Sequence, residues 1–173
     1  QAWLKAGEPS KALPFLLLAI QDARNAWLLE RTEHIADLIS EAAIQSHSQM
    51  GLLEGRLNRL EVRLKRSRLS GIQDLALQVE KMGQLDGQSV GRLALIHADF
   101  LIQKKKWVQA NQYLRQALSH FSKNSDRKGR AQTFLKQGQL LLTLNRLEGA
   151  ADRFAQTSVI SPKTSIEWVE SQA

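Results

Sequence analysis

The amino-acid sequence predicts an all-α fold, a superhelix or solenoid built from antiparallel helical hairpins. Apolar residues recur at three- and four-residue spacing along nearly the whole chain, and the alternation typical of strands is absent. Glycines, prolines and short polar runs divide these stripes into short helices. A pattern of small and large side chains then recurs from one helix pair to another, and such internal repetition indicates stacked helical hairpins.

The expected helix boundaries follow from the residues that interrupt helices. The run Gly7-Glu8-Pro9-Ser10 ends one helix and begins the next, with Ser10 as a candidate N-cap and Pro14 in the first turn, where its missing N–H is tolerated. Gly51 is expected to separate the two helices of the next hairpin, and Ser122 to Gly129 to form a polar loop. The predicted hairpins occupy residues 1–25, 28–68, 89–122 and 129–160, with an extra short helix at 73–82 and a tail helix at 163–170.

Three glycines precede the third hairpin. Gly83, Gly87 and Gly91 are spaced four residues apart, as in helix contacts made by small residues. They fall in a polar segment with Asp86 and Gln88, so we expect a loop there.

The repeat is anchored on a small residue near the start of the second helix of a hairpin. Around Ala110, large residues lie three positions before and four after, and small residues lie seven after and twelve before; similar spacings surround Ala150 and Ala12. The small residues let the two helices approach closely, and the large ones pack against the next hairpin. The predicted packing residues are Ala12, Leu16 and Ala19; Ala98, Trp107, Ala110, Leu114 and Ala117; and Gly138, Leu147, Ala150 and Phe154.

Two features depart from a regular repeat. Ala110 and Ala150 are forty residues apart, whereas a tetratricopeptide repeat is about 34 residues long, and we assign the excess to the polar loop. In the hairpin at 28–68, Arg56 occupies the anchor position when the count starts from Gly51. The sequence therefore predicts a tetratricopeptide-like repeat with one degenerate hairpin, and a generic helical bundle is the alternative.

The tryptophans of the chain are expected to serve packing. They lie beside leucines at helical spacing, which favours a place in the core or between repeats over the stacking of bases. They are Trp3, Trp27, Trp107 and Trp168.

Composition excludes several classes of protein. With 173 residues, 43% of them hydrophobic and 24% charged, the chain can form a folded domain with a core. It contains no cysteine, which excludes a disulfide framework and cysteine-based zinc sites. No apolar stretch reaches the roughly 18 residues of a membrane-spanning helix. We expect an intracellular protein with no membrane partner.

The sequence shows no pattern of residues that carries chemistry. No phosphate-binding loop or hydrolase nucleophile motif is present. His34, Asp37 and Glu41 share a helix face, but solvation explains that face better than a metal does. We therefore expect a protein that is not an enzyme and holds no cofactor or metal. The four histidines are far apart and match no metal-binding spacing, at His34, His47, His97 and His120.

The net charge of +7 points to the possible partners. Arginines concentrate at 56–68, and polar residues recur on the first helices of the two later hairpins. A solvated face or an acidic protein segment explains this balance better than nucleic acid does. Asp99 would repel a carboxylate, so the carboxylate clamp of some tetratricopeptide domains is expected to be incomplete. The candidate partner-binding residues are Arg63, Arg66, Arg92, Asp99, Gln132, Lys136 and Gln139.

Three segments resemble a particular repeat family. The run GEPSKALPFLLLAI, from Gly7 to Ile20, resembles the C-terminal tetratricopeptide region of the fifth subunit of the anaphase-promoting complex (cyclosome). The runs LDGQSVGRLAL and HFSKNSDRKGRAQTFLKQGQLLLTLNR resemble, in the expected order, that family's Asp-Gly segment and its phenylalanine–x–lysine loop with the following helix. Arg56 and the long segment from Leu64 to Gly83 depart from the family's pattern.

This resemblance implies a non-catalytic scaffold subunit of a large E3 ubiquitin ligase that controls the cell cycle. Its partners would be other subunits of the complex, and its location the nucleus and cytoplasm. The helix-like start QAWLKAG also leads us to expect one helical-repeat segment of a longer protein. Two alternatives stay open: a regulatory module that binds a peptide or protein outside any ubiquitin ligase, and a basic helical repeat that binds nucleic acid.

Overall fold

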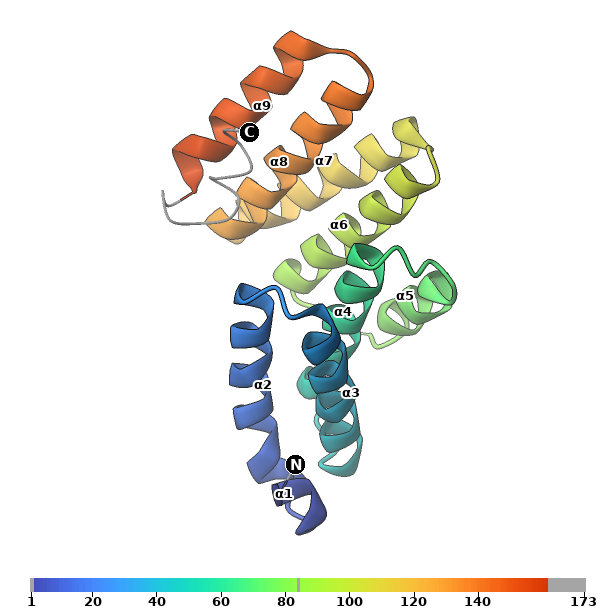
Figure 1. Ribbon diagram of the computed structural model, residues 1–173, viewed down its shortest axis with the longest axis vertical. Coiled ribbons are helices and arrows are strands. Elements are labelled where there is room, and N and C mark those ends of the chain that lie inside the picture. Colours follow the sequence, from blue (N-terminus) through green and yellow to red (C-terminus); the bar gives the residue numbers. More distant parts are fainter. Residues whose placement is uncertain (1, 84, 162–173) are drawn as a thin grey trace. The chain divides into compact units, whose positions relative to one another are not determined.

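The computed structural model describes residues 2–83 and 85–161, and throughout these residues the regular elements are helices (Figure 1). The prediction of an all-α fold is therefore confirmed for this part of the chain. The chain divides into two compact units, Gln1–Gln84 and Leu85–Ala173. The predicted tail helix at 163–170, with Trp168, lies outside the described residues.

The first unit is a row of helices in which each packs against the next along the chain. The short helix α1 packs on α2, α2 on α3 and α3 on α4, and α5 packs on α4. Its elements are α1 (Ala2–Lys5), α2 (Pro9–Asn25), α3 (Leu29–Gln45), α4 (Gln49–Lys65) and α5 (Ile72–Glu80). The hairpin of α3 and α4 covers the range in which the sequence predicts the second hairpin.

The second unit contains two helical hairpins, α6 with α7 and α8 with α9. The helix α8 also contacts α7 and the more distant α6, so the first helices of the two hairpins lie beside each other. The elements are α6 (Gly87–Gln103), α7 (Trp107–Lys123), α8 (Arg127–Thr143) and α9 (Leu147–Ile160).

A helix and its turn repeat with a period of twenty residues within each unit. Six helices, α2, α3, α4, α6, α7 and α8, are each 17 residues long. The residue with positive φ in each turn marks the period, because these residues fall twenty positions apart. They are Gly7, Trp27, His47 and Ser67 in the first unit, and Lys105, Ser125 and Asn145 in the second.

Every one of these turns closes the preceding helix in the same way. In the turn after α2, the N–H of Leu28 donates to the carbonyl of Ala23 (3.0 Å) and that of Trp27 to the carbonyl of Arg24 (3.1 Å). This pair of bonds is the Schellman motif, in which one left-handed residue reverses the chain direction. In every one of these turns except the one after α4, the residue that completes the motif is also the N-cap of the next helix, so three residues join the two helices. After α4 the N-cap of the next helix is Gly71.

The structure corrects the boundary placed at Gly51. The turn lies at His47, whose φ is 54°, and Gly51 lies in the first turn of α4. A Cβ at Gly51 would meet the side chains of Leu13 and Ala43 at 2.8 and 3.0 Å, so this glycine serves close packing and not a turn. The local signal is Ser48, whose Oγ accepts from the N–H of Gly51 (3.1 Å) and caps the helix.

The anchor assigned to Arg56 is wrong for the same reason. Counted from the turn at His47, the position that matches Ala12 is Leu52, which is partly buried. The small residues that bring α4 close to α3 are Gly51 and Gly55, both buried.

The polar loop predicted from Ser122 to Gly129 is also much shorter than expected. The helix α7 extends to Lys123 and α8 begins at Arg127, which leaves Asn124 to Asp126 between them. The spacing of forty residues between Ala110 and Ala150 therefore comes from helices of 17 residues and not from an inserted loop.

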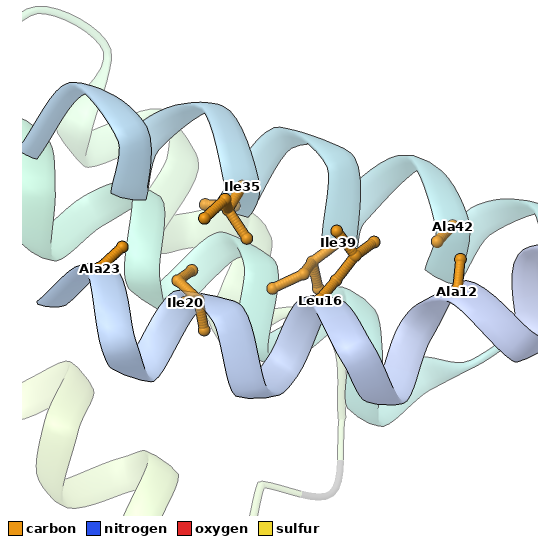
Figure 2. Packing of buried hydrophobic residues seen from close by; sticks show 8 residues of the cluster. Ala12, Leu16, Ile20, Ala23, Ile35, Ile39 and Ala42 are labelled. Carbon is orange, nitrogen blue, oxygen red and sulfur yellow. The ribbon is translucent and has the colours of Figure 1, made fainter. Parts of the chain in front are cut away.

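One hydrophobic core cluster of the first unit lies between α2 and α3. Figure 2 shows Leu16 and Ile20 of α2 directed toward Ile35 and Ile39 of α3. Alanines at Ala12, Ala23, Ala36 and Ala42 complete the cluster, and their small size allows the two helices to lie close together.

The core of the second unit joins α6, α7 and α8. Ala98, Leu114 and Ala117 are fully buried in it, as the repeat predicts, and Leu140 adds the contribution of α8. Gly87 and Gly91 begin α6 and do not form the loop expected there. Gly91 is buried because the ring of Phe121 lies against it.

The remaining predicted packing residues divide by exposure. The prediction that Leu147 is a packing residue is wrong, since 60% of its surface is exposed. Gly138 of α8 packs against the ring of Phe154 of α9, as expected of a small residue that lets the two helices of a hairpin approach closely. Buried residues are Ala12, Leu16, Ala98, Ala110, Leu114, Ala117, Gly138 and Ala150, and partly buried ones are Ala19, Trp107 and Phe154.

Candidate protein-binding face

The candidate residues of the second unit lie on α6 and α8, the first helices of its two hairpins. Arg92 and Asp99 are on α6, and Gln132, Lys136 and Gln139 are on α8. Arg92 and Gln132 occupy the same place in the forty-residue repeat, as do Asp99 and Gln139. Gln139 is exposed and the other four are partly buried. We call these five residues the α6–α8 face.

Two aspartates set the start of the helices that carry this face. Asp86 accepts from the N–H of Ser89 (2.6 Å) at the start of α6, and Asp126 accepts from the N–H of Gly129 (2.9 Å) at the start of α8. Both are N-caps, which satisfy amide groups that a helix leaves unpaired. Because the caps are forty residues apart, α6 and α8 begin at the same level of the repeat.

An ion pair connects the two helices across the face. The Nζ of Lys136 lies 2.7 Å from Oδ1 of Asp99, and both side chains are more than two-thirds buried. The structure thus brings together two of the predicted residues. Their charges neutralise each other, which leaves a mixed polar face with no strong excess of either sign. A clamp for a ligand carboxylate is not assembled from these two residues.

A shallow hollow lies near the N-terminal ends of α6 and α8. Within it, the Nε2 of Gln88 donates to Oδ2 of Asp126 (3.3 Å) and the Nδ2 of Asn124 donates to the carbonyl of His120 (2.7 Å). The first bond connects α6 to the N-cap of α8, whereas the second closes the C-terminal end of α7, so the hollow is best explained as a structural junction. It is lined by Asp86, Gln88, Asn124, Ser125, Asp126 and Arg127.

The candidate residues of the first unit have a different environment. Arg63 and Arg66 both contact the carboxylate of Glu33, at 3.7 and 3.0 Å, and Arg68 contacts it at 3.2 Å. The Glu33 side chain is only 15% exposed. It therefore neutralises part of the arginine-rich stretch from within the same unit.

The acidic partners of these arginines could have been found from the sequence. In an antiparallel hairpin, residues at equal distances from the turn face each other. Acidic residues on α3 and arginines on α4 lie at equal distances on either side of Ser48, and all of them pair in the structure. The mirrored pairs are Asp37–Arg59, Glu33–Arg63 and Glu30–Arg66, at eleven, fifteen and eighteen residues from Ser48.

Two further contacts reduce the accessible positive charge of α4. Arg56 donates to the carbonyl of Gln78 near the end of α5 (3.4 Å). The Nζ of Lys65 lies 4.5 Å from the ring centroid of Trp27. Trp27 is a turn residue with 48% exposure, so of the two places expected for the tryptophans, in the core or between repeats, the core is wrong for this one.

The helices offer neither a metal-binding cluster nor a membrane-spanning segment within the described residues. Across residues 2–83 and 85–161, histidine and acidic side chains form no group of three that could hold a metal ion. In the same part of the chain, no helix has both the length and the apolar character needed to cross a membrane.

No family model matches this chain, and comparison with curated proteins gives no match either.

Proposed function

We propose that this chain is a non-catalytic scaffold of repeated helical hairpins, and that its α6–α8 face binds a protein partner. The observation that carries the proposal is the regular placement of α6 and α8. Equal helices with equal caps lie beside each other and are joined by the Asp99–Lys136 ion pair, and the five positions of the face carry polar side chains and not core residues. Helical repeats use such faces as extended binding surfaces.

The character of the face indicates the character of the partner. Asp99 and Lys136 pair with each other, so their charges balance. The face then offers polar groups for hydrogen bonds and the positive charge of Arg92. A partner with its own mixed polar surface fits this better than a uniformly acidic segment. Nucleic acid is the weaker candidate, because the arginines of α4 are already paired with carboxylates of α3.

The test is affinity purification of the full-length protein from its native cells, with mass spectrometry of the bound proteins. Gln139→Arg adds a charge at an exposed position of the face and should lower recovery of the partner by about tenfold or more, which corresponds to about 1.4 kcal/mol. Gln112→Arg places the same charge at an exposed position of α7 and serves as the control. Equal recovery with both variants would contradict binding at this face.

The finer proposal, a structural subunit of the anaphase-promoting complex, rests on the sequence resemblance alone. The same purification tests it. Recovery of cullin-like, RING and other repeat subunits in near-equal amounts would support the ligase. Recovery of a single partner would favour a regulatory module outside any ubiquitin ligase.

A further inference from the structure

The first full helix of the chain leaves an apolar face uncovered. Phe15 and Leu18 of α2 are each 63% exposed, whereas Leu16 and Ile20 of the same helix are buried against α3. Phe15 and Leu18 are one turn apart, so they lie on the same side of α2. None of the residues of the α6–α8 face belongs to this side, so its role is independent of the proposed function.

The twenty-residue repeat shows what should lie against Phe15. Phe15 comes eight residues after the left-handed residue Gly7. At the same position of other helices, the residue contacts the helix that precedes it. Three such contacts are Gly55 of α4 against Ala36 and Ser40 of α3; Tyr113 of α7 stacked on His97 of α6 with ring centroids 5.0 Å apart; and Arg153 of α9 over the ring of Phe134 of α8 at 5.6 Å.

The helix before α2 is α1, and it already meets α2 in the way that a preceding helix does. Its turn has the same two bonds as the others, from Gly7 N–H to the carbonyl of Leu4 (3.1 Å) and from Glu8 N–H to the carbonyl of Trp3 (2.9 Å). Leu4 packs against the core of the unit. The helix α1 is described for only one turn, Ala2–Lys5, so in the direction away from Gly7 it is too short to reach the level of Phe15.

We propose that the face of Phe15 and Leu18 binds an amphipathic α-helix that is collinear with α1 and continues it toward the N-terminal side. The contacts should come from positions seven to eleven residues before Gly7, because Ser40, His97, Ala36 and Phe134 hold those positions relative to their own turns. The side chains at these positions in the other helices are small or flat, and we expect small or flat side chains at the same positions of the proposed helix.

The register specifies a test that does not require the identity of the natural helix. Because α6 and α1 both end two residues before the left-handed residue, Gln1 corresponds to Asp99. The sequence Asp86–Ala98 is therefore fused directly ahead of Gln1 in the full chain. The copy of His97 in the fusion then lies at the level of Phe15.

The fusion should raise the melting temperature by about 5 °C or more, since it buries two large apolar side chains in a small unit. Amide exchange of α2 should slow by about tenfold, as a covered helix opens less often. Phe15→Gln should remove most of this gain in the fused chain and change the unfused chain little. A second fusion, of Leu28–Ser40, uses α3 in the same register and should behave alike.

The proposal is overturned if neither fusion stabilises the chain. It is also overturned if each fusion stabilises the Phe15→Gln chain as much as the original chain, because the added residues then act without contacting this face. Concentration-dependent self-association of the unfused chain that Phe15→Gln abolishes would instead assign the face to a second copy, and sedimentation measures this.

Discussion

The ring of Phe121 in α7 lies directly on the backbone of Gly129 in α8. A Cβ at Gly129 would overlap three atoms of that ring, and Gly91 of α6 is nearly as close to the same ring. Phe121 is 1% exposed, so it has no room to move away. One aromatic side chain of α7 thus fixes the approach of α6 and α8, the two helices that carry the α6–α8 face.

Gly129→Ala should therefore destabilise the protein by about 1–3 kcal/mol, because overpacking displaces a buried ring. Gly149→Ala is the matched control, since its Cβ would meet only Leu141, at 3.4 and 3.9 Å. There the gain in helix propensity, about 0.5–1 kcal/mol, should dominate. Chemical denaturation of both variants measures the difference, and equal effects would contradict the packing described.

Asp126→Ala should cost about 1 kcal/mol, the usual contribution of an N-cap. It removes the bond to Gly129 and also the bond from Gln88. Asp126→Ser keeps a capping oxygen and should recover most of the loss. Asp152→Ala, at an exposed position of α9, provides the control. A loss of stability with Asp126→Ser as large as with Asp126→Ala would show that the cap is not the cause; thermal unfolding compares the three variants.

Glu33→Gln should destabilise the protein more than Glu30→Gln does. The Glu33 carboxylate is largely buried and contacts three arginines, and hydrogen bonds to charged groups contribute about 1.5–3 kcal/mol. Glu30 is 86% exposed and pairs only at the surface, where its effect should be small. Urea denaturation compares the two variants. Equal stabilities would show that the buried carboxylate is not what neutralises the arginines.

Ser125→Gly should stabilise the protein by about 0.5–1 kcal/mol. Ser125 has a φ of 54°, a conformation that strains residues with a Cβ and suits glycine. The greater freedom of glycine in the unfolded chain offsets part of this gain. Ser122→Gly, at an exposed position of α7, should be destabilising because glycine weakens a helix. Thermal unfolding distinguishes the two signs, and a loss of stability with Ser125→Gly would contradict the assigned turn.

The sequence by itself determined the helical class of this protein and the identity of most of its packing residues. Ala98, Ala110 and Leu114 repeat at spacings that bury one side of a helix whatever its neighbours are. Periodicity is a local property, and local properties are readable along the chain. The sequence prediction explains the forty-residue spacing wrongly, by an inserted loop, because Ser122 to Gly129 has the composition of a loop. Most of this segment belongs instead to the end of α7 and the start of α8.

Only the tertiary structure decided where the turns lie and which charges pair between different hairpins. His47 takes the left-handed conformation, whereas Gly51 lies within α4, where the side chains of Leu13 and Ala43 of neighbouring helices pack against it. Likewise, Asp99 and Lys136 meet only because α6 and α8 lie side by side. A glycine that permits a turn and one that permits close packing look the same in a sequence, and the packing of the helices distinguishes them.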